Sequence, residues 1–235
     1  MNWVSVAADR WGEWIRSVAL ALVVWLLLRT FVVQAFHITS ESMEGTLLVG
    51  DVLWVARPLY GAEVPFTDRR LPAIRELQAG DIVVFGSVET PGLEVVKRVV
   101  GVSGDTLAMR AGTLIRNGTP LDEPYVVRAR PGQPDPPESR EAIRRWQEPR
   151  LAGPHATPYQ PDRNNWGPVV VPADSLFVMG DNRDFSWDGR FWGFLPRQNV
   201  HGGPLVIYYS FDPGSWRPLP LLTATRWGRL FTVPK

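Results

Sequence analysis

Leu93-Glu-Val-Val-Lys97-Arg-Val-Val-Gly101 places a single lysine inside a run of valines. The β-branched residues predict a strand, and their density predicts that the strand is buried. Lysine is rare in this chain: of its 25 Lys and Arg residues, only Lys97 and Lys235 are lysines. A buried lysine can lose its proton and act as a base, whereas arginine stays protonated in proteins. We therefore expect burial to lower the pKa of Lys97. The alternative is a surface lysine on a strand.

The composition of the whole chain sets broad limits. A length of 235 residues accommodates one large or two small domains. A hydrophobic content of 45% with 21% charged residues indicates a folded core rather than disorder. The net charge of +1 gives no argument for a nucleic-acid partner. The absence of cysteine excludes a disulfide framework, a thiolate metal site and a cysteine nucleophile.

The N-terminal region carries a long apolar segment, residues 14–36, which we interpret as a transmembrane anchor. Arg10 and Arg16 lie at its beginning, so the positive-inside rule places residues 1–13 in the cytoplasm and the rest of the chain outside. The alternative is a cleaved signal peptide, because Val33-Gln-Ala35 has the small-residue pattern of a cleavage site.

The remainder of the chain is predicted to be rich in β-structure. Short apolar runs bounded by Gly, Pro or Asp predict strands at 51–56, 81–85, 94–102 and 205–209. Residues 106–118 predict a hairpin that ends in an Asn-Gly turn. Residues 131–168 are rich in proline and charge and are expected to form a surface excursion, with one short helix over Glu138–Gln147.

Common catalytic and metal-binding motifs are absent from the sequence. The three histidines His37, His155 and His201 have no recognisable hydrolase context. There is no His-Glu-x-x-His, no cysteine pair and no phosphate-binding Gly-x-x-x-x-Gly-Lys. The sequence therefore predicts neither a metal nor a cofactor.

Two serines stand one residue apart in Ser40-Glu-Ser42-Met-Glu-Gly-Thr-Leu47. One hydroxyl could attack a carbonyl while the other donates to the developing oxyanion. By itself the stretch is also compatible with a polar turn. With Lys97 as a neutral base, it becomes a candidate Ser-Lys dyad.

A second polar stretch, Gly180-Asp-Asn-Arg-Asp-Phe-Ser-Trp-Asp-Gly-Arg190, is followed at once by aromatic residues. Such a density of hydrogen-bonding groups is typical of a rigid loop around a site. The alternative is a salt-bridged loop with a structural role only.

Taken in chain order, these motifs resemble those of bacterial type I signal peptidases. The resemblance rests on the N-terminal segment and on four motifs at 40–47, 80–85, 97–101 and 180–190. It implies a mostly β fold, with a signal-peptidase-like catalytic β domain, a smaller β extension and one N-terminal transmembrane helix. The catalytic domain would comprise 37–106 and 176–212, the variable extension 107–175, and an unassigned tail 213–235.

The resemblance also implies roles for individual residues. Ser42 would be the nucleophile, Lys97 its general base, Ser40 an oxyanion donor beside the backbone N–H of Ser42, and Ser186 a hydrogen-bonding partner that orients the lysine. A further set would support the site, with Asp188 and Arg190 forming a pair: Met43, Arg98, Asp181, Arg183, Asp188 and Arg190. Two positions depart from the family. Gly45 stands where proline is usual, which predicts a looser turn, and Gly189 stands where many members have serine.

The function implied is that of a serine endopeptidase anchored by a single pass in the cytoplasmic membrane. It would remove signal peptides from exported preproteins on the outer face, with the lipid bilayer and the preproteins as partners and no metal or cofactor. Two alternatives stay open at this point. One is another Ser-Lys acyl-transfer enzyme, although the Ser-x-x-Lys and Lys-Thr-Gly motifs of penicillin-binding proteins and the helix-turn-helix of a self-cleaving repressor are missing. The other is an anchored β module without activity.

Overall fold

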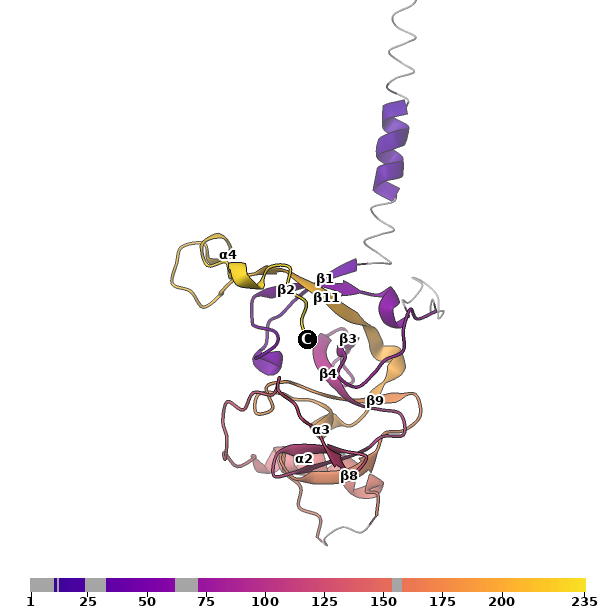
Figure 1. The fold of residues 1–235 in the computed structure, drawn as a ribbon, viewed down its shortest axis with the longest axis vertical. Coiled ribbons are helices and arrows are strands. Elements are labelled where there is room, and N and C mark those ends of the chain that lie inside the picture. The colour runs from indigo at the N-terminus through magenta and orange to yellow at the C-terminus, as the bar shows by residue number, and fades with distance from the viewer. Residues whose placement is uncertain (1–10, 12, 24–32, 62–71, 154–157) are drawn as a thin grey trace, which may run out of the picture.

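Two antiparallel sheets make up the structure, a computed structural model that describes residues 11, 13–23, 33–61, 72–153 and 158–235 (Figure 1). The larger sheet has the strand order β1-β2-β11-β3-β4-β9-β10, and the smaller has the order β7-β6-β5-β8. The larger sheet is built from β1 (Val33–His37), β2 (Asp51–Ala56), β3 (Ile82–Gly86), β4 (Glu94–Val102), β9 (Ser175–Met179), β10 (Leu195–Pro196) and β11 (Val200–Ser210). The smaller sheet is built from β5 (Thr106–Arg110), β6 (Thr113–Arg116), β7 (Thr119–Pro120) and β8 (Trp166–Val170). The predicted mostly β fold is confirmed.

The helical elements are short. They are α2 (Pro137–Gln147), α3 (Gly189–Trp192), α4 (Pro220–Thr223) and the 3₁₀ turns η1 (Glu41–Met43), η2 (Pro58–Tyr60), η3 (Glu148–Arg150), η4 (Arg197–Asn199) and η5 (Trp227–Arg229). Strands β2 and β4 have the bounds that the sequence predicted. Strand β11 is longer than the predicted 205–209, because it runs along both β2 and β3 and changes partner through register shifts.

The predicted hairpin at 106–118 is also present. Strands β5 and β6 pair through Ala111-Gly112, and Asn117-Gly118 turns the chain into β7. All four turn residues have positive φ. That backbone conformation is the one a two-residue type I′ turn requires, which accounts for Asn-Gly at the second turn.

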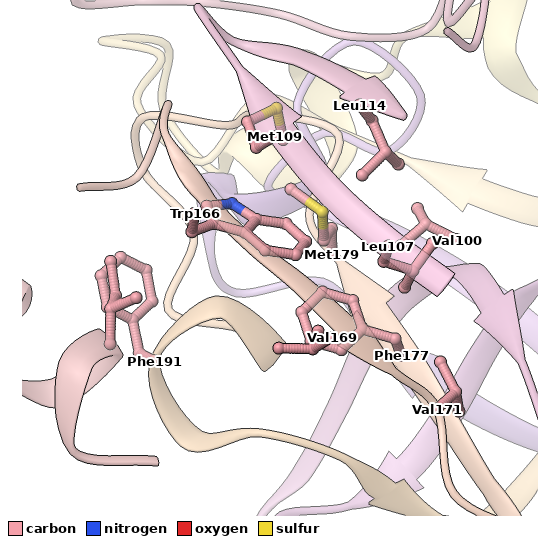
Figure 2. Close-up of a cluster of buried hydrophobic side chains, with 11 residues drawn as sticks. Val100, Leu107, Met109, Leu114, Trp166, Val169, Val171, Phe177, Met179 and Phe191 are labelled. Atoms are coloured by element: carbon pink, nitrogen blue, oxygen red, sulfur yellow. The ribbon is translucent and has the colours of Figure 1, made fainter. Parts of the chain in front are cut away.

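The two sheets share a hydrophobic core, drawn in Figure 2. Val100, Phe177 and Met179 come from the larger sheet, and Leu107, Met109 and Trp166 come from the smaller one. Because these side chains are at most 2% exposed, burying each contributes about 1.5–3 kcal/mol. The extension is therefore packed directly against the strands that carry the predicted site.

Part of the proline-rich region is not a surface excursion, and that prediction is wrong for α2 and β8. Helix α2 has the predicted extent within one residue, but its Ile143 is fully buried in the shared core. Trp146 Nε1 donates to the carbonyl of Arg190, 2.8 Å away. The reason is that Ile143, Trp146 and Gln147 lie on one uncharged face of a helix whose sequence is otherwise rich in charge.

The predicted anchor, 14–36, is described only in part. Residues 13–23 are helical and exposed, and residues 24–32 lie outside the described residues. Val33–His37 do not continue a helix but form β1, paired with β2 so that Phe36 faces Leu53. The predicted end of the anchor at Phe36 is therefore wrong, because strand pairing satisfies this backbone. Among the described residues, no helix has both the length and the apolar character needed to cross a bilayer.

The C-terminal residues 213–235, for which the sequence predicted no role, are fastened to β2 and to the turn that precedes it. Arg229 forms an ion pair with the fully buried Asp51 at 2.6 Å. Arg226 Nη1 donates to the carbonyl of Val49 at 2.8 Å. In Figure 1 this yellow segment, with α4, lies at the same end of the body as β1.

Candidate active site

Ser42 lies in the 3₁₀ turn η1, directly after β1 has ended, and only 6% of its surface is exposed. The turn is fixed on its core side by Met43 and Leu47, which are fully buried in one hydrophobic cluster. From the other side, the backbone N–H of Asn182 donates to the carbonyl of Ser42 at 3.2 Å. The serine is therefore presented on a turn held by core packing and by the polar loop.

Lys97 lies in the middle of β4 and is 3% exposed. Its Nζ is 2.6 Å from Ser42 Oγ and 3.1 Å from the carbonyl oxygen of Val96. Burial lowers the pKa of Lys97 to about 8, outweighing the opposing effect of the negative charge on Asp188. Within the described residues, no carboxylate forms an ion pair with this amine. A substantial fraction of Lys97 is thus neutral at mildly alkaline pH and able to accept a proton.

Ser40 lies at the open side of the same turn. Its Oγ is 3.3 Å from Ser42 Oγ, and the residue is exposed. The two hydroxyls and the lysine amine therefore meet at one point, although they come from two segments 55 residues apart.

Asp188 and Arg190 form a pair within the polar loop, and both are fully buried. Arg190 Nε lies 2.9 Å from Asp188 Oδ1, and Nη2 lies 2.9 Å from Oδ2. Burial by itself would raise the pKa of the Asp188 carboxyl, but the charge and hydrogen bonds of Arg190 and the N–H of Gly180 bring it below its usual value. Asp188 is therefore an anion that holds the loop and is not a proton carrier.

Ser186 is buried in this loop, but the structure does not show the expected hydrogen bond to Lys97. The Ser186 hydroxyl lies beside the Asp188 carboxylate and helps to lower the pKa of that carboxyl, although no hydrogen bond of good geometry joins the two side chains. The amine of Lys97 directs its contacts to Ser42 and to the carbonyl of Val96 instead. Gly180 lets the two segments approach, because a Cβ there would lie 2.3 Å from both Ser186 Oγ and the carbonyl oxygen of Ser42.

Arg98, the neighbour of Lys97, points to the other side of β4 and binds Asp181. Its Nε and Nη2 are 2.8 and 2.6 Å from the two carboxylate oxygens. Thr46 Oγ1 donates to the same carboxylate at 2.6 Å. Arg98 and Asp181 are almost fully buried, so this ion pair links β4, the turn after Ser42 and the polar loop.

Sequence reasoning missed the segment Glu123–Val127 of the extension, which packs against the site. Glu123 forms two hydrogen bonds with the buried Arg183, at 3.0 and 2.6 Å. The ring of Tyr125 lies under Arg98 at 3.8 Å. Val127 bridges the polar loop through backbone hydrogen bonds with Asp181 and Arg183. No motif marks these residues, because they act through contacts with β4 and with the polar loop, both of which are distant in sequence.

The expectation that Gly45 loosens the turn is wrong. Gly45 has φ +103°, a value that proline, with φ near −65°, does not adopt. A Cβ at this position would lie 2.6 Å from Cγ2 of Val127. The side chain of Val127, from the extension, therefore occupies the space that a side chain at position 45 would take. Gly189 is also tightly enclosed, since its Cβ would lie 2.9 Å from the carbonyl oxygen of Val178.

Ser42 and Lys97 open on a cleft of about 410 Å³. The side near β1 is lined by Phe36, Ile38 and Ser40, and the β3–β4 hairpin contributes Phe85, Val95 and Val96. Glu89, which lies in no motif, and Trp187, which lies in the 180–190 motif but was given no role, also line it. His37 and Glu94 lie at its edge, and Glu94 is 2.9 Å from Nδ1 of His201. His155 lies outside the described residues.

Comparison with known proteins identifies the family of the chain. Residues 11–209 match the family model described as signal peptidase, peptidase S26. The chain belongs to this signal peptidase family. It is 35% identical over 207 residues to signal peptidase I of Leptolyngbya laminosa, covering 85% of this chain and 80% of that protein. It is 31% identical over 226 residues to signal peptidase I of Pseudomonas aeruginosa, covering 88% and 76%. It is 29% identical over 201 residues to signal peptidase I S of Bacillus subtilis, covering 85% and 90%. The resemblance to type I signal peptidases and the predicted enzyme class are thereby confirmed.

Proposed function

We propose that this protein cleaves signal peptides from exported preproteins, with Ser42 as nucleophile and Lys97 as general base. The observation that carries the proposal is the 2.6 Å contact between Ser42 Oγ and the buried, unpaired amine of Lys97. This geometry is within the reach needed for direct proton transfer. The geometry also disfavours an inactive β module. If Lys97 only filled space in the core, a methionine would pack as well without the cost of burying an amine.

The mechanism follows from the positions of the side chains. Neutral Lys97 takes the proton of Ser42 as its Oγ attacks the carbonyl carbon of the scissile bond. The oxyanion of the tetrahedral intermediate accepts hydrogen bonds from the Ser40 hydroxyl and the backbone N–H of Ser42. Lys97 then gives its proton to the leaving amine, which leaves an acyl-enzyme. A water molecule, deprotonated by Lys97, then attacks the ester carbonyl of the acyl-enzyme. The ester bond to Ser42 Oγ breaks, Lys97 returns the proton to that oxygen, and the signal peptide leaves with a new C-terminal carboxylate.

The supporting residues keep the three reacting groups in register. Asp188 and Arg190 hold the loop that carries Ser186, while Arg98 and Asp181 tie β4 to the turn after Ser42. Ser186 is proposed to orient the amine once a substrate has entered, because its buried Oγ packs against Gly180 beside the backbone of Ser42. Buried Ile38 and Val96 narrow the cleft beside Ser42, which favours substrates with small residues before the cut.

We further propose that the enzyme works at the membrane surface, on the outer face, anchored by the apolar residues before β1. Ser42 follows Val33 by nine positions, which span at most about 30 Å of chain. Trp54 is 42% exposed and stacks on Tyr208 at 5.2 Å. The C-terminal segment at the same end exposes further large apolar side chains: Trp216, Leu219, Leu221, Leu222, Trp227 and Phe231. Such residues favour the bilayer interface.

Incubation of the purified protein with a preprotein tests the proposal. We expect one cut at the end of the signal peptide and no cut by Ser42→Ala. Cleavage by Ser42→Ala at the wild-type rate, or none by the wild type, contradicts it. A penicillin-binding or self-cleaving enzyme would instead react with a β-lactam or with itself.

The membrane part of the proposal has its own tests. A shortened form should retain Val33, because β1 begins there, and should cleave a short soluble peptide poorly. Detergent or lipid should raise its activity on a full-length preprotein more than on the peptide. Equal stimulation would mean that the membrane is only an anchor. Protease added to spheroplasts should digest the domain that follows β1, and protection of that domain would overturn the topology.

A further inference from the structure

The cleft that contains Ser42 and Lys97 is bridged by a hydrogen bond between two loops. Nε1 of Trp187, from the polar loop, donates to Oε2 of Glu89 at 2.6 Å. Glu89 belongs to the turn that joins β3 to β4, so the bond connects this turn with the polar loop. Both residues line the same cleft as the candidate dyad.

Each partner is held in place by its own neighbours. The indole of Trp187 stacks face to face on Phe191, with ring centroids 4.4 Å apart and planes at 9°. On the other side, Ser87 Oγ accepts from the backbone N–H groups of Glu89 and Thr90, at 3.3 and 3.1 Å. The carboxylate is therefore presented at a defined place and does not simply extend into solvent.

The charge of Glu89 is not neutralised. Within the described part of the chain it forms no ion pair, and its side-chain partner is the uncharged indole. Glu94, also in the cleft, is engaged by Gln34 Nε2 at 3.3 Å and by His201 at 2.9 Å. Arg130 stacks on Phe185 at 4.1 Å and is not within ion-pair distance of Glu89. The ionisable side chains that line the cleft are His37, Glu89, Glu94 and Lys97. With Lys97 neutral during attack, the cleft carries net negative charge.

We propose that Glu89, positioned by Trp187, is a specificity determinant that disfavours acidic residues and favours basic ones in the part of the substrate that passes this bridge. The inference rests on the proposed function, because it concerns the peptide that occupies the cleft with its scissile carbonyl at Ser42. A peptide in a cleft of about 410 Å³ lies within a few residues of the bridge on one side of the cut. Opposite charges at an exposed site attract by up to about fivefold in affinity, and like charges repel by a similar factor.

The test uses the full-length protein in detergent and a neutral reference peptide. In a set of variants of this peptide, one position at a time on either side of the cut carries Lys or Glu. The readout is the ratio of kcat/KM for the Lys peptide to kcat/KM for the Glu peptide at each position. Because both values come from the same enzyme variant, differences in overall activity cancel. We expect a ratio of about ten for the wild type at one or two adjacent positions. It should fall towards one in Glu89→Gln and invert in Glu89→Lys.

Matched variants separate this role from general effects. Trp187→Phe keeps a ring on Phe191 but loses the N–H donor, so its ratio should lie between those of the wild type and Glu89→Gln. Glu141→Gln should keep the wild-type ratio, because this side chain is 44% exposed on α2 and does not line the cleft. A ratio near one at every position in the wild type, an unchanged ratio in Glu89→Gln, or its loss in Glu94→Gln alone would overturn the inference. In each of these outcomes the reference peptide is still cleaved, so the proposed function stands. Failure to cleave any peptide or preprotein refutes that function itself.

Discussion

Lys97 and Arg98 are neighbours on strand β4, and their side chains point to opposite sides of the strand into different environments. Lys97 and Arg98 are each 3% exposed. Arg98 meets the carboxylate of Asp181 in two hydrogen bonds, whereas Lys97 meets a serine hydroxyl and a backbone carbonyl. Burial is therefore not what distinguishes them. The difference is whether a counter-ion is within reach.

This difference separates a structural cation from a base. A buried cation with an anion beside it keeps its proton and links the segments around it. A buried amine without an anion is destabilised in its charged form, and its pKa falls. The pKa of Lys97 falls to about 8, even though Asp188 raises it in part from within the polar loop. Asp188 is itself neutralised by Arg190, which leaves the amine without a close counter-ion.

The largest effect, a loss of activity, is expected when Lys97 is replaced by a cation that cannot lose its proton. Lys97→Arg keeps the positive charge but provides no group that can accept the serine proton, so kcat/KM should fall by about 10⁴-fold or more. The measurement is preprotein cleavage, with circular dichroism to establish that the variant is folded. Near-normal turnover would show that Lys97 is not the base.

The complementary change on the other side of the strand should affect stability first. Arg98→Met leaves Asp181 buried and unpaired, which should lower the free energy of unfolding by about 3–5 kcal/mol. Chemical denaturation measures it. Arg144→Met serves as the control, because Arg144 pairs with Glu141 at an exposed site and should change stability by less than about 0.5 kcal/mol. Equal losses in both variants would remove the contrast between the two sides.

Because Arg98 faces away from Ser42, the oxyanion must depend on uncharged donors. Ser40→Ala removes one of them and should lower kcat by about 10²–10³ with little change in KM. Single-turnover cleavage would measure it, with Ser42→Ala expected to show no chemistry at all. A Ser40→Ala enzyme of full activity would exclude this hydroxyl from the oxyanion site.

The smallest effect is an increase in the free energy of unfolding, opposite in sign to the effect of Arg98→Met. The folded-state pKa of Lys97 is about 8, below its unfolded value near 10.5, so its burial costs stability at neutral pH and ceases to do so as the pH rises through 10.5. Lys97→Met should therefore raise the free energy of unfolding at pH 7 by about 1–3 kcal/mol while abolishing activity. The gain should shrink at pH 10. A variant less stable than the wild type at pH 7 would mean that the amine is stabilising.

Local pattern in the sequence was sufficient for the strands around the site, whereas the roles of its reacting groups came from the resemblance to signal peptidases. The valines around Lys97 predicted both the strand and its burial, and the stretch Ser40–Leu47 was compatible with a polar turn. The Asn117-Gly118 turn was predicted from its backbone requirement. Each of these rests on neighbours in sequence, where periodicity and turn chemistry are direct evidence.

The sequence did not predict what depends on approach between distant segments. The packing of Val127 against Gly45 reverses the expected effect of losing a proline, and no motif marks it. The buried face of α2 was hidden by its charged residues, and the strand at Val33–Phe36 by an apolar run that reads equally as the end of a helix. Trp187 stands inside the 180–190 motif but received no role, because its partner Glu89 lies 98 residues earlier in the chain.

The central claim, that Lys97 is a buried amine poised to be neutral, is tested most directly by titrating that amine. Since the chain contains only two lysines, labelling lysine Nζ with ¹⁵N gives two side-chain signals, and Lys235→Arg identifies the one from Lys97. We predict that the Lys97 signal titrates with a pKa of about 8, and that the acidic limb of kcat/KM follows this signal. A Lys97 signal that titrates near the ordinary lysine value of 10.5 would contradict the account.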